Sequence, residues 1–331
     1  MPAMIETSGL RRTFRTRGGE VEAVRGVDMQ VAAGEIVGFL GPNGAGKTTT
    51  LRMLTTLLRP TAGTATVAGS DVATDPVGVR RKVGYVAQGG VTYPEARAGE
   101  ELVDHARLYG ISRSEARRRA RTLFEQLDLP GLFDRPCKSL SGGQRRRLDI
   151  AMGLVHGPGL IFLDEPTSGL DPQSRANLWQ HIRGLRDDLG TTVFLTTHYL
   201  EEADALCDRI MIIDHGEIVA RGTPDELKRG VSGDVITLAL ADASDSGAAA
   251  ATAARVAGTE PTVDGVTVHL QVADGAATLP SLLRHLNVEG IRATSVEVRR
   301  PSLDDVFLDL TGRSLRDEPA AQTGAEYAHS A

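Results

Sequence analysis

The chain contains few aromatic residues and few cysteines. Aromatic side chains make up 4% of the 331 residues, and a single tryptophan is present. Because hydrophobic residues still reach 41%, we expect a core built mainly from leucine, valine, isoleucine and alanine. The two cysteines, Cys137 and Cys207, do not have the spacing of metal ligands. This usage is typical of reduced cytosolic residues rather than of a metal site or a disulfide framework.

Long apolar runs and an excess of positive charge are also missing. No run approaches the roughly 18–20 apolar residues that span a bilayer, and residues 1–10 lack the layout of a signal peptide. We therefore expect a chain that does not cross a membrane by itself, although it could dock onto a protein that does. With 37 Lys and Arg against 43 Asp and Glu, the net charge is −6, which gives no electrostatic case for a general nucleic-acid binder.

A phosphate-binding loop is the most informative stretch that is present. Residues 36–40 form a short apolar run that predicts a buried strand, and residues 41–48 match the pattern G-x-x-x-x-G-K-[ST]. Residues 51–58 follow as a helix-forming run. The order of strand, loop and helix distinguishes this stretch from a chance glycine-rich turn. The sequence therefore predicts a site for a nucleoside triphosphate.

The residue types in this loop match the chemistry of a triphosphate. Gly41, Gly44 and Gly46 let the backbone approach the anion closely, with N–H groups pointing inward. The helix that should begin near Lys47 directs its positive dipole end at the same anion. Lys47 brings a full charge to the β- and γ-phosphates, and Thr48 offers a hydroxyl to Mg²⁺.

Polar residues follow two further predicted strands. Gln88 comes directly after residues 83–87, and from there its side chain could reach Mg²⁺ or the attacking water. Asp164 and Glu165 follow the apolar residues 160–163. A carboxylate at this place holds Mg²⁺, usually through water, and the adjoining glutamate can polarise a water towards the γ-phosphate. The alternatives are a solvent-exposed glutamine and a salt-bridged acidic turn.

Two more motifs offer contacts to an anion. Residues 140–144, Leu-Ser-Gly-Gly-Gln, place the natural N-cap Ser141 and two glycines of open backbone before a predicted helix. This is a second helix N-terminus that could bind an anion. His198 follows the predicted strand of residues 192–197. A histidine at the carboxyl edge of a parallel sheet lies where the ligands of such sheets bind.

Phe14 lies between two predicted edge strands, residues 5–10 and 21–31. It is followed by the basic, glycine-containing stretch 15–19. Its ring could stack on an adenine or could belong to a minor core, and the sequence leaves both interpretations open.

The pattern of elements divides the chain. Residues 1–233 carry the motifs, and about residues 98–156 within them are helical in character. Residues 234–313 predict a small α+β unit, and an Asp-Gly pair in it signals a hairpin. This unit could sense a ligand or could serve dimerisation or packing. Residues 314–331 are polar and predict disorder.

Taken together and in this order, the motifs resemble those of the nucleotide-binding subunits of ABC transporters. The likeness covers about residues 4–228, and the Leu-Ser-Gly-Gly-Gln stretch separates this family from other phosphate-loop ATPases. Residues 300–312, with residues 55–60 and 146–150, look like the daunorubicin/doxorubicin-resistance (DrrA-type) branch of drug exporters. The resemblance implies an α/β fold: a phosphate-loop NTPase domain of the ABC type with a helical and an antiparallel β subdomain, and a small α+β C-terminal domain.

The resemblance also implies roles for individual residues. Phe14 would stack on adenine, and Glu165 would be the catalytic base, with His198 and Gln88 assisting it. The cofactors would be ATP and Mg²⁺, with Thr48, Gln88 and Asp164 near the metal ion and Asp164 acting through water. The phosphates would be held by Gly41, Pro42, Asn43, Gly44, Ala45, Gly46, Lys47, Thr48 and Thr49. The ATP bound to a second copy would be contacted by Ser141, Gly142 and Gly143, with Asp171 at the dimer seam.

The function implied is that of an ATPase subunit of an ABC-2 type exporter for a drug or natural product. The phosphate loop and the Ser141 region are separated by a helical subdomain, so a head-to-tail pair is needed to enclose each ATP. A separate permease would hold the pair at the cytoplasmic face of a bacterial membrane, with no nucleic acid involved. The alternative is a soluble, non-transport ABC ATPase that acts on nucleic acid or ribosomes.

Overall fold

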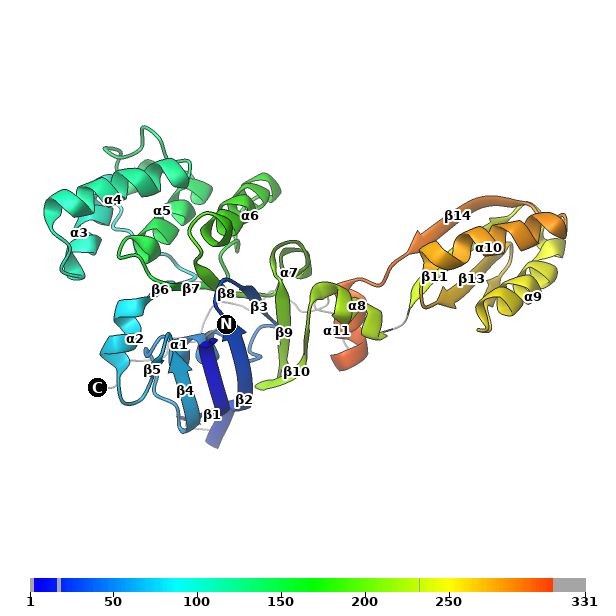
Figure 1. Ribbon diagram of the computed structural model, residues 1–331, viewed down its shortest axis with the longest axis horizontal. Coiled ribbons are helices and arrows are strands. Elements are labelled where there is room, and N and C mark those ends of the chain that lie inside the picture. The colour runs from blue at the N-terminus through cyan, green and yellow to red at the C-terminus, as the bar shows by residue number, and fades with distance from the viewer. Residues whose placement is uncertain (1–2, 17–18, 232, 312–331) are drawn as a thin grey trace. The chain divides into compact units, whose positions relative to one another are not determined.

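The computed structural model describes residues 3–16, 19–231 and 233–311 (Figure 1). The chain divides into two compact units, the first ending at Arg221 and the second beginning at Gly222. This division precedes Gly233, where the sequence analysis placed the boundary. The predicted disordered tail, residues 314–331, lies outside the described residues. Within the described ranges, no helix is both long and apolar enough to cross a membrane.

The central sheet of the first unit has the strand order β10-β9-β3-β8-β7-β6. From β9 through β3, β8 and β7 to β6, neighbouring strands are parallel. Every residue of β3, β7 and β8 is buried, as expected for strands covered on both faces. The strands of this sheet are β3 (Ile36–Leu40), β6 (Val83–Val86), β7 (Leu160–Asp164), β8 (Thr192–Thr197), β9 (Arg209–Asp214) and β10 (Glu217–Gly222).

A second sheet, with strand order β2-β1-β4-β5, packs on the same core. Its strands are β1 (Ala3–Thr16), β2 (Gly19–Ala32), β4 (Ala62–Val67) and β5 (Ser70–Asp71). Ile5 and Leu10 of β1 are fully buried and share a cluster with Phe39 and Phe194 of the central sheet. We expected residues 5–10 to be an edge strand, but β1 pairs with both β2 and β4. The pairing with β4 joins residues far apart in the chain, which no local pattern reveals.

Helices connect the strands of the first unit: α1 (Lys47–Leu54), α2 (Pro76–Lys82), α3 (Ala98–Leu108), α4 (Arg113–Gln126), the 3-10 turn η1 (Cys137–Ser139), α5 (Gly142–Leu154), α6 (Pro172–Asp187) and α7 (Leu200–Leu206). The sequence analysis missed α2, although Asp75 caps it and a proline begins it. In α5 the Ser141 side chain accepts from Gln144 N while the Gln144 side chain accepts from Ser141 N. This reciprocal pair fixes the start of the helix.

The second unit contains a sheet with strand order β12-β13-β11-β14. Its elements are α8 (Pro224–Val231), β11 (Asp234–Leu240), η2 (Ala243–Asp245), α9 (Ser246–Ala257), β12 (Thr262–Asp264), β13 (Thr267–Val272), α10 (Gly275–Val288), β14 (Ala293–Arg299) and α11 (Leu303–Thr311). Alternate residues of β11, such as Ile236 and Leu238, join a core with Ala249 of α9 and Leu282 of α10. The hairpin joins β12 to β13, and Gly265 in its turn has φ 58°.

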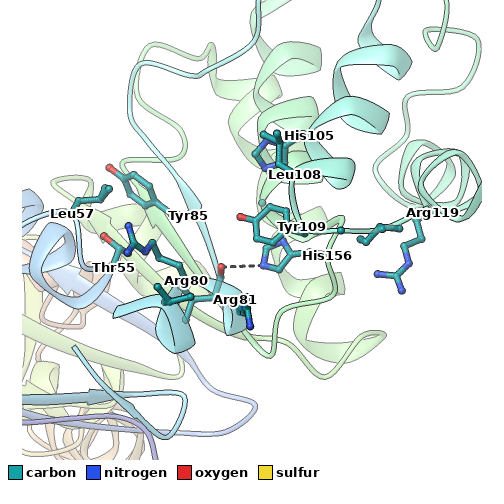
Figure 2. A pocket seen from close by; sticks show the side chains of 15 residues that line it. Thr55, Leu57, Arg80, Arg81, Tyr85, His105, Leu108, Tyr109, Arg119 and His156 are labelled. Atoms are coloured by element: carbon teal, nitrogen blue, oxygen red, sulfur yellow. Dashed lines mark hydrogen bonds between the residues drawn. The ribbon is translucent and has the colours of Figure 1, made fainter. Parts of the chain in front are cut away.

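A half-buried histidine joins the helical part of the first unit to the central sheet. The ring of His156 stacks on Tyr109 at a centroid distance of 4.0 Å, and its Nε2 donates to Val83 O at 3.1 Å (Figure 2). Burial lowers the pKa of His156 to about 4, and the nearby charges of His105 and Arg119 act in the same direction. The bond to Val83 O opposes this shift without cancelling it.

This histidine should make the unit less stable in acid. As the pH falls from about 6.5 towards 4, the unfolded chain binds a proton that folded His156 excludes, so the free energy of unfolding declines. His156→Phe keeps the stack and removes the titration. The decline measured by urea unfolding at successive pH values should then shrink by about 1–2 kcal/mol, after allowance for solvent at this half-buried ring. Tyr109→Phe is the control and should keep the full decline; an unchanged decline in His156→Phe would contradict the assignment.

Candidate functional site

The phosphate loop joins β3 to α1 at the carboxyl edge of the central sheet. Gly41 N donates to Thr197 O at 3.3 Å, which ties the start of the loop to the end of β8. Gly46 has φ 105°, and a Cβ there would lie 2.5 Å from Ala23 O, so only glycine fits. No side chain caps α1. The first N–H groups of α1 therefore stay available to an anion.

Lys47 is buried beneath this loop, with 5% of its surface exposed. Its Nζ donates to Gly41 O at 2.7 Å and to Pro42 O at 2.9 Å. The same nitrogen lies 3.7 Å from Glu165 Oε1. The lysine charge is thus fixed between the loop and a carboxylate that comes from another strand.

Two of the three predicted metal-binding residues touch directly. Thr48 Oγ1 donates to Asp164 Oδ1 at 3.1 Å, and Thr196 Oγ1 donates to the same oxygen at 2.7 Å. Among the described residues there is no cluster of three or more His, Cys, Asp or Glu that could hold a metal ion. A hydroxyl, one carboxylate and the amide of Gln88 are the hard oxygen ligands that suit Mg²⁺, whose other ligands would be water and phosphate. The residues present therefore fit this ion.

The three predicted catalytic residues meet at one carboxylate. Gln88 Nε2 donates to Glu165 Oε2 at 2.8 Å, and His198 Nδ1 lies 3.2 Å from the same oxygen. They follow β6, β7 and β8, whose parallel pairing brings the strand ends together. Glu165 itself is 9% exposed, and its φ of 44° lies in the left-handed region that non-glycine residues rarely adopt.

The pKa of Glu165 is lowered despite its burial. Desolvation alone raises this pKa, but the hydrogen bond and charge of His198, together with the charge of Lys47, outweigh it. Glu165 is therefore ionised at neutral pH, which is the form that can accept a proton.

A cavity of about 640 Å³ joins these groups to Phe14. Phe14 lines it from β1, together with Lys47, Thr48, Gln88 and Glu165. The guanidinium of Arg12 lies over the Phe14 ring, 4.7 Å from its centroid. Further lining residues that the sequence analysis did not name are Glu22, Arg25, Arg52 and His215.

Ser141, Gly142, Gly143 and Asp171 are not among the described residues that line this cavity. Ser141 and Asp171 cap α5 and α6, and both are exposed. Asp171 Oδ1 accepts from Ser174 N at 2.9 Å. A Cβ on Gly143 would lie 3.3 Å from Ser174 Oγ, so the two helix starts lie side by side. The predicted site residues thus form two groups, one around the phosphate loop and Glu165 and one on these helix starts.

The sequence analysis missed Thr196, which donates to Asp164 and whose Oγ1 also accepts from Glu165 N at 3.0 Å. Its place opposite Asp164 follows from the register of β7 on β8. A single sequence contains no signal for that register, because the apolar runs of the two strands, residues 160–163 and 193–195, do not encode their alignment.

Two family models match the chain. The ABC transporter model matches residues 24–168, and the model of the C-terminal domain of DrrA1-3-like ATP-binding proteins matches residues 222–311. The daunorubicin resistance ATP-binding protein DrrA2 of Streptomyces coeruleorubidus is 45% identical over 308 residues, which are 92% of this chain and 95% of the relative. The chain belongs to the ATP-binding subunits of ABC transporters. It lies in their DrrA-like branch, and it is an ATPase.

Further comparisons agree with this membership. The daunorubicin/doxorubicin resistance ATP-binding protein DrrA of Streptomyces peucetius is 45% identical over 333 residues, 97% of this chain and 96% of the relative. The solved structure of a dimeric ATP-binding cassette in a post-hydrolysis state, bound to ADP and Pi, is 27% identical with a TM-score of 0.61, over 66% of this chain and 98% of that one. The predicted family and fold class are confirmed. These relatives give no support to the alternative of a non-transport ATPase.

The close packing of the phosphate loop on β9 gives a test. A Cβ on Gly41 would lie 2.2 Å from Ile213 O, so Gly41→Ala must displace backbone. We expect Gly41→Ala to lower the free energy of unfolding by about 1–3 kcal/mol and to weaken ATP binding, as measured by urea unfolding and calorimetry. The control is Gly89→Ala, where a Cβ meets nothing within 4 Å and the change should stay within about 0.5 kcal/mol. Equal effects of the two variants would contradict this packing.

Proposed function

We propose that this ATPase powers the export of a drug or natural product through a separate permease. The convergence of Lys47, Gln88 and His198 on an ionised Glu165 supports the chemistry. The resistance proteins at 45% identity support the direction of transport and the class of cargo.

The phosphate loop would bind the triphosphate of ATP, with the Lys47 charge and the α1 N–H groups meeting the β- and γ-phosphates. Thr48, Gln88 and Asp164 would hold Mg²⁺, with Asp164 acting through water. When bound, this ion supplies charge neutralisation on the β- and γ-oxygens. Phe14 would stack on the adenine at the far end of the cavity.

Glu165 would take a proton from the attacking water. Its lowered pKa keeps it ionised, and Gln88 and His198 fix its Oε2 from two sides. His198, at the end of β8, would also contact the γ-phosphate. This geometry favours a water placed between the carboxylate and the phosphate.

A second copy would complete each site. Ser141 and the glycines after it lie on α5, outside the cavity lining, so within one protomer they do not contribute to the cavity. In a head-to-tail pair they would contact the γ-phosphate bound to the other copy, with Asp171 at the seam. Loss of that phosphate removes charge-assisted hydrogen bonds across the pair and loosens it. The pair would lie on the permease at the cytoplasmic face of the membrane, and no nucleic acid would take part.

Replacing the proposed base tests this chemistry. Glu165→Gln keeps the size of the side chain and removes its proton affinity, so we expect ATP turnover to fall by about 10²–10⁴-fold. ATP-bound pairs should then accumulate, as measured by size-exclusion chromatography with ATP. Glu201→Gln, an exposed carboxylate on α7, is the matched control. Turnover of Glu165→Gln close to that of the unaltered chain would refute the assignment.

A second groove, which Tyr85 of β6 helps to line, supports the contact with a permease (Figure 2). It measures about 950 Å³ and lies between α2 with β6 and the helices α3 to α5. Leu57, Val77 and Leu108 expose 56%, 51% and 83% of their surfaces there. Lone exposed apolar residues are common, but several around one groove indicate an interaction surface.

The charge of the groove indicates what would occupy it. Arg80, Arg81 and Arg119 line it beside the apolar residues. We propose that a permease segment with an apolar face and acidic side chains docks here. Tyr85, one of the residues that line the groove, lies on β6 shortly before Gln88. A movement of the docked permease segment would therefore be transmitted along β6 to Gln88 in the catalytic centre.

One negative charge added to this groove should separate docking from ATP binding. Leu108→Glu adds a negative charge where an acidic segment would dock. We therefore expect at least about tenfold less protein to be recovered with membranes that contain the permease, with ATP affinity unchanged. Leu189→Glu, an apolar residue 43% exposed outside this groove, is the control. Full recovery of Leu108→Glu would place the docking surface elsewhere.

A further inference from the structure

Arg146, in α5, is a buried cation that binds backbone rather than a carboxylate. It is 7% exposed. Its Nη1 donates to Ala87 O at 2.6 Å, its Nη2 to Asp164 O at 2.8 Å and its Nε to Pro166 O at 2.8 Å. All three guanidinium nitrogens thus have a carbonyl partner. A planar fork of donors suits this arrangement, and a single ammonium does not.

These carbonyls lie where two strands separate. The parallel ladder of β6 on β7 ends at the pair Val86 and Leu163. The next residues, Ala87 and Asp164, are bridged by the guanidinium of Arg146. The side chain therefore continues the link between the strands at the edge of the sheet that carries the catalytic groups.

The same guanidinium fixes both neighbours of Glu165. It binds the carbonyls of Asp164 and Pro166, which flank Glu165 in the chain. Glu165 N is fixed in turn by Thr196 Oγ1 at 3.0 Å. The φ of 44° at Glu165 is unfavourable for a residue with a Cβ and persists only where the surroundings enforce it. The hydrogen bonds from Arg146 and Thr196 hold the Glu165 backbone in this conformation.

α5 also binds the loop after β6 at two places. Arg146 binds the carbonyl of Ala87, directly before Gln88. Asp149, one turn later in α5, accepts from Val91 N at 3.4 Å. Helix α5 thus supports Gln88 as well as the backbone on both sides of Glu165.

We propose that Arg146 is a positioning residue, which orients the Glu165 carboxylate and links it to α5. Since Ser141 caps the start of α5, the helix that would contact the nucleotide of the second copy is then rigidly joined to the base of its own site. This inference rests on the proposed role of Glu165. A merely structural role, satisfying buried carbonyls, would affect stability and not the use of Glu165.

The test is Arg146→Lys, which keeps the charge and loses the fork. We expect kcat to fall about 100-fold because the base is misplaced, while the KM for ATP changes by less than about twofold, since the Lys47 loop is untouched. The matched control is Arg145→Lys, an exposed neighbour whose Nη2 donates to Cys137 O at 3.3 Å, and it should keep its kcat. An unchanged kcat in Arg146→Lys would overturn the proposal.

A double variant separates positioning from general damage. If Arg146 acts through Glu165, then Arg146→Lys combined with Glu165→Gln should hydrolyse ATP at the residual rate of Glu165→Gln alone. A further large loss in the double variant would overturn the proposal. If Glu165→Gln alone is fully active, the proposed function fails first; if it is inactive while Arg146→Lys is fully active, this inference alone fails.

The folding of each variant is checked by circular dichroism and by its affinity for ATP. If Arg146→Lys does not fold, Arg146→Gln takes its place in these experiments. If neither folds, hydrogen exchange in the unaltered chain decides. The amides of residues 163–165 and 167 should then exchange as slowly as those in the middle of α5, and fast exchange there would overturn the proposal.

Discussion

The parallel pairing of β3, β8, β7 and β6 is the constraint on which the rest of the site depends. It places the carboxyl ends of these strands at one edge of the sheet. Glu165 meets Lys47, Gln88 and His198 there, although these residues are far apart in the chain. The apolar strands are buried on both faces and fix this edge, and we propose that the polar residues after them perform the chemistry. An ionised base is possible in this buried place only because cations and donors face it.

In the proposed function, the work of the site is divided between two surfaces of the chain. The cavity contains the phosphate loop and the base, whereas Ser141 and Asp171 lie on exposed helix starts. A solved cassette with 27% identity and the same fold is dimeric, which supports the pairing that we propose. In our account, Arg146 links the two surfaces rigidly. The same movement that closes a pair would therefore also align the Glu165 carboxylate.

Much of the site could be predicted from local sequence. The strand of residues 36–40, the helix that begins at Lys47 and the cap at Ser141 each have a pattern tied to one geometry. The meeting of Gln88, Glu165 and His198 was predictable because parallel strands end at a common edge. Three features could not be predicted: the interior position of β1, the role of Thr196 and the hydrogen bonds of Arg146 to backbone carbonyls. Each depends on strand register or on long-range packing, which apolar runs do not encode.

The central claim is that one ATP site needs two copies of the chain. The most direct measurement is ATP turnover per chain across a range of protein concentrations, from well below to well above the concentration at which pairs form. Our account predicts that turnover per chain rises with concentration and then levels off as pairs form. A turnover per chain that stays constant down to concentrations at which sedimentation shows monomers would contradict the account, because a single protomer would then hold a complete site.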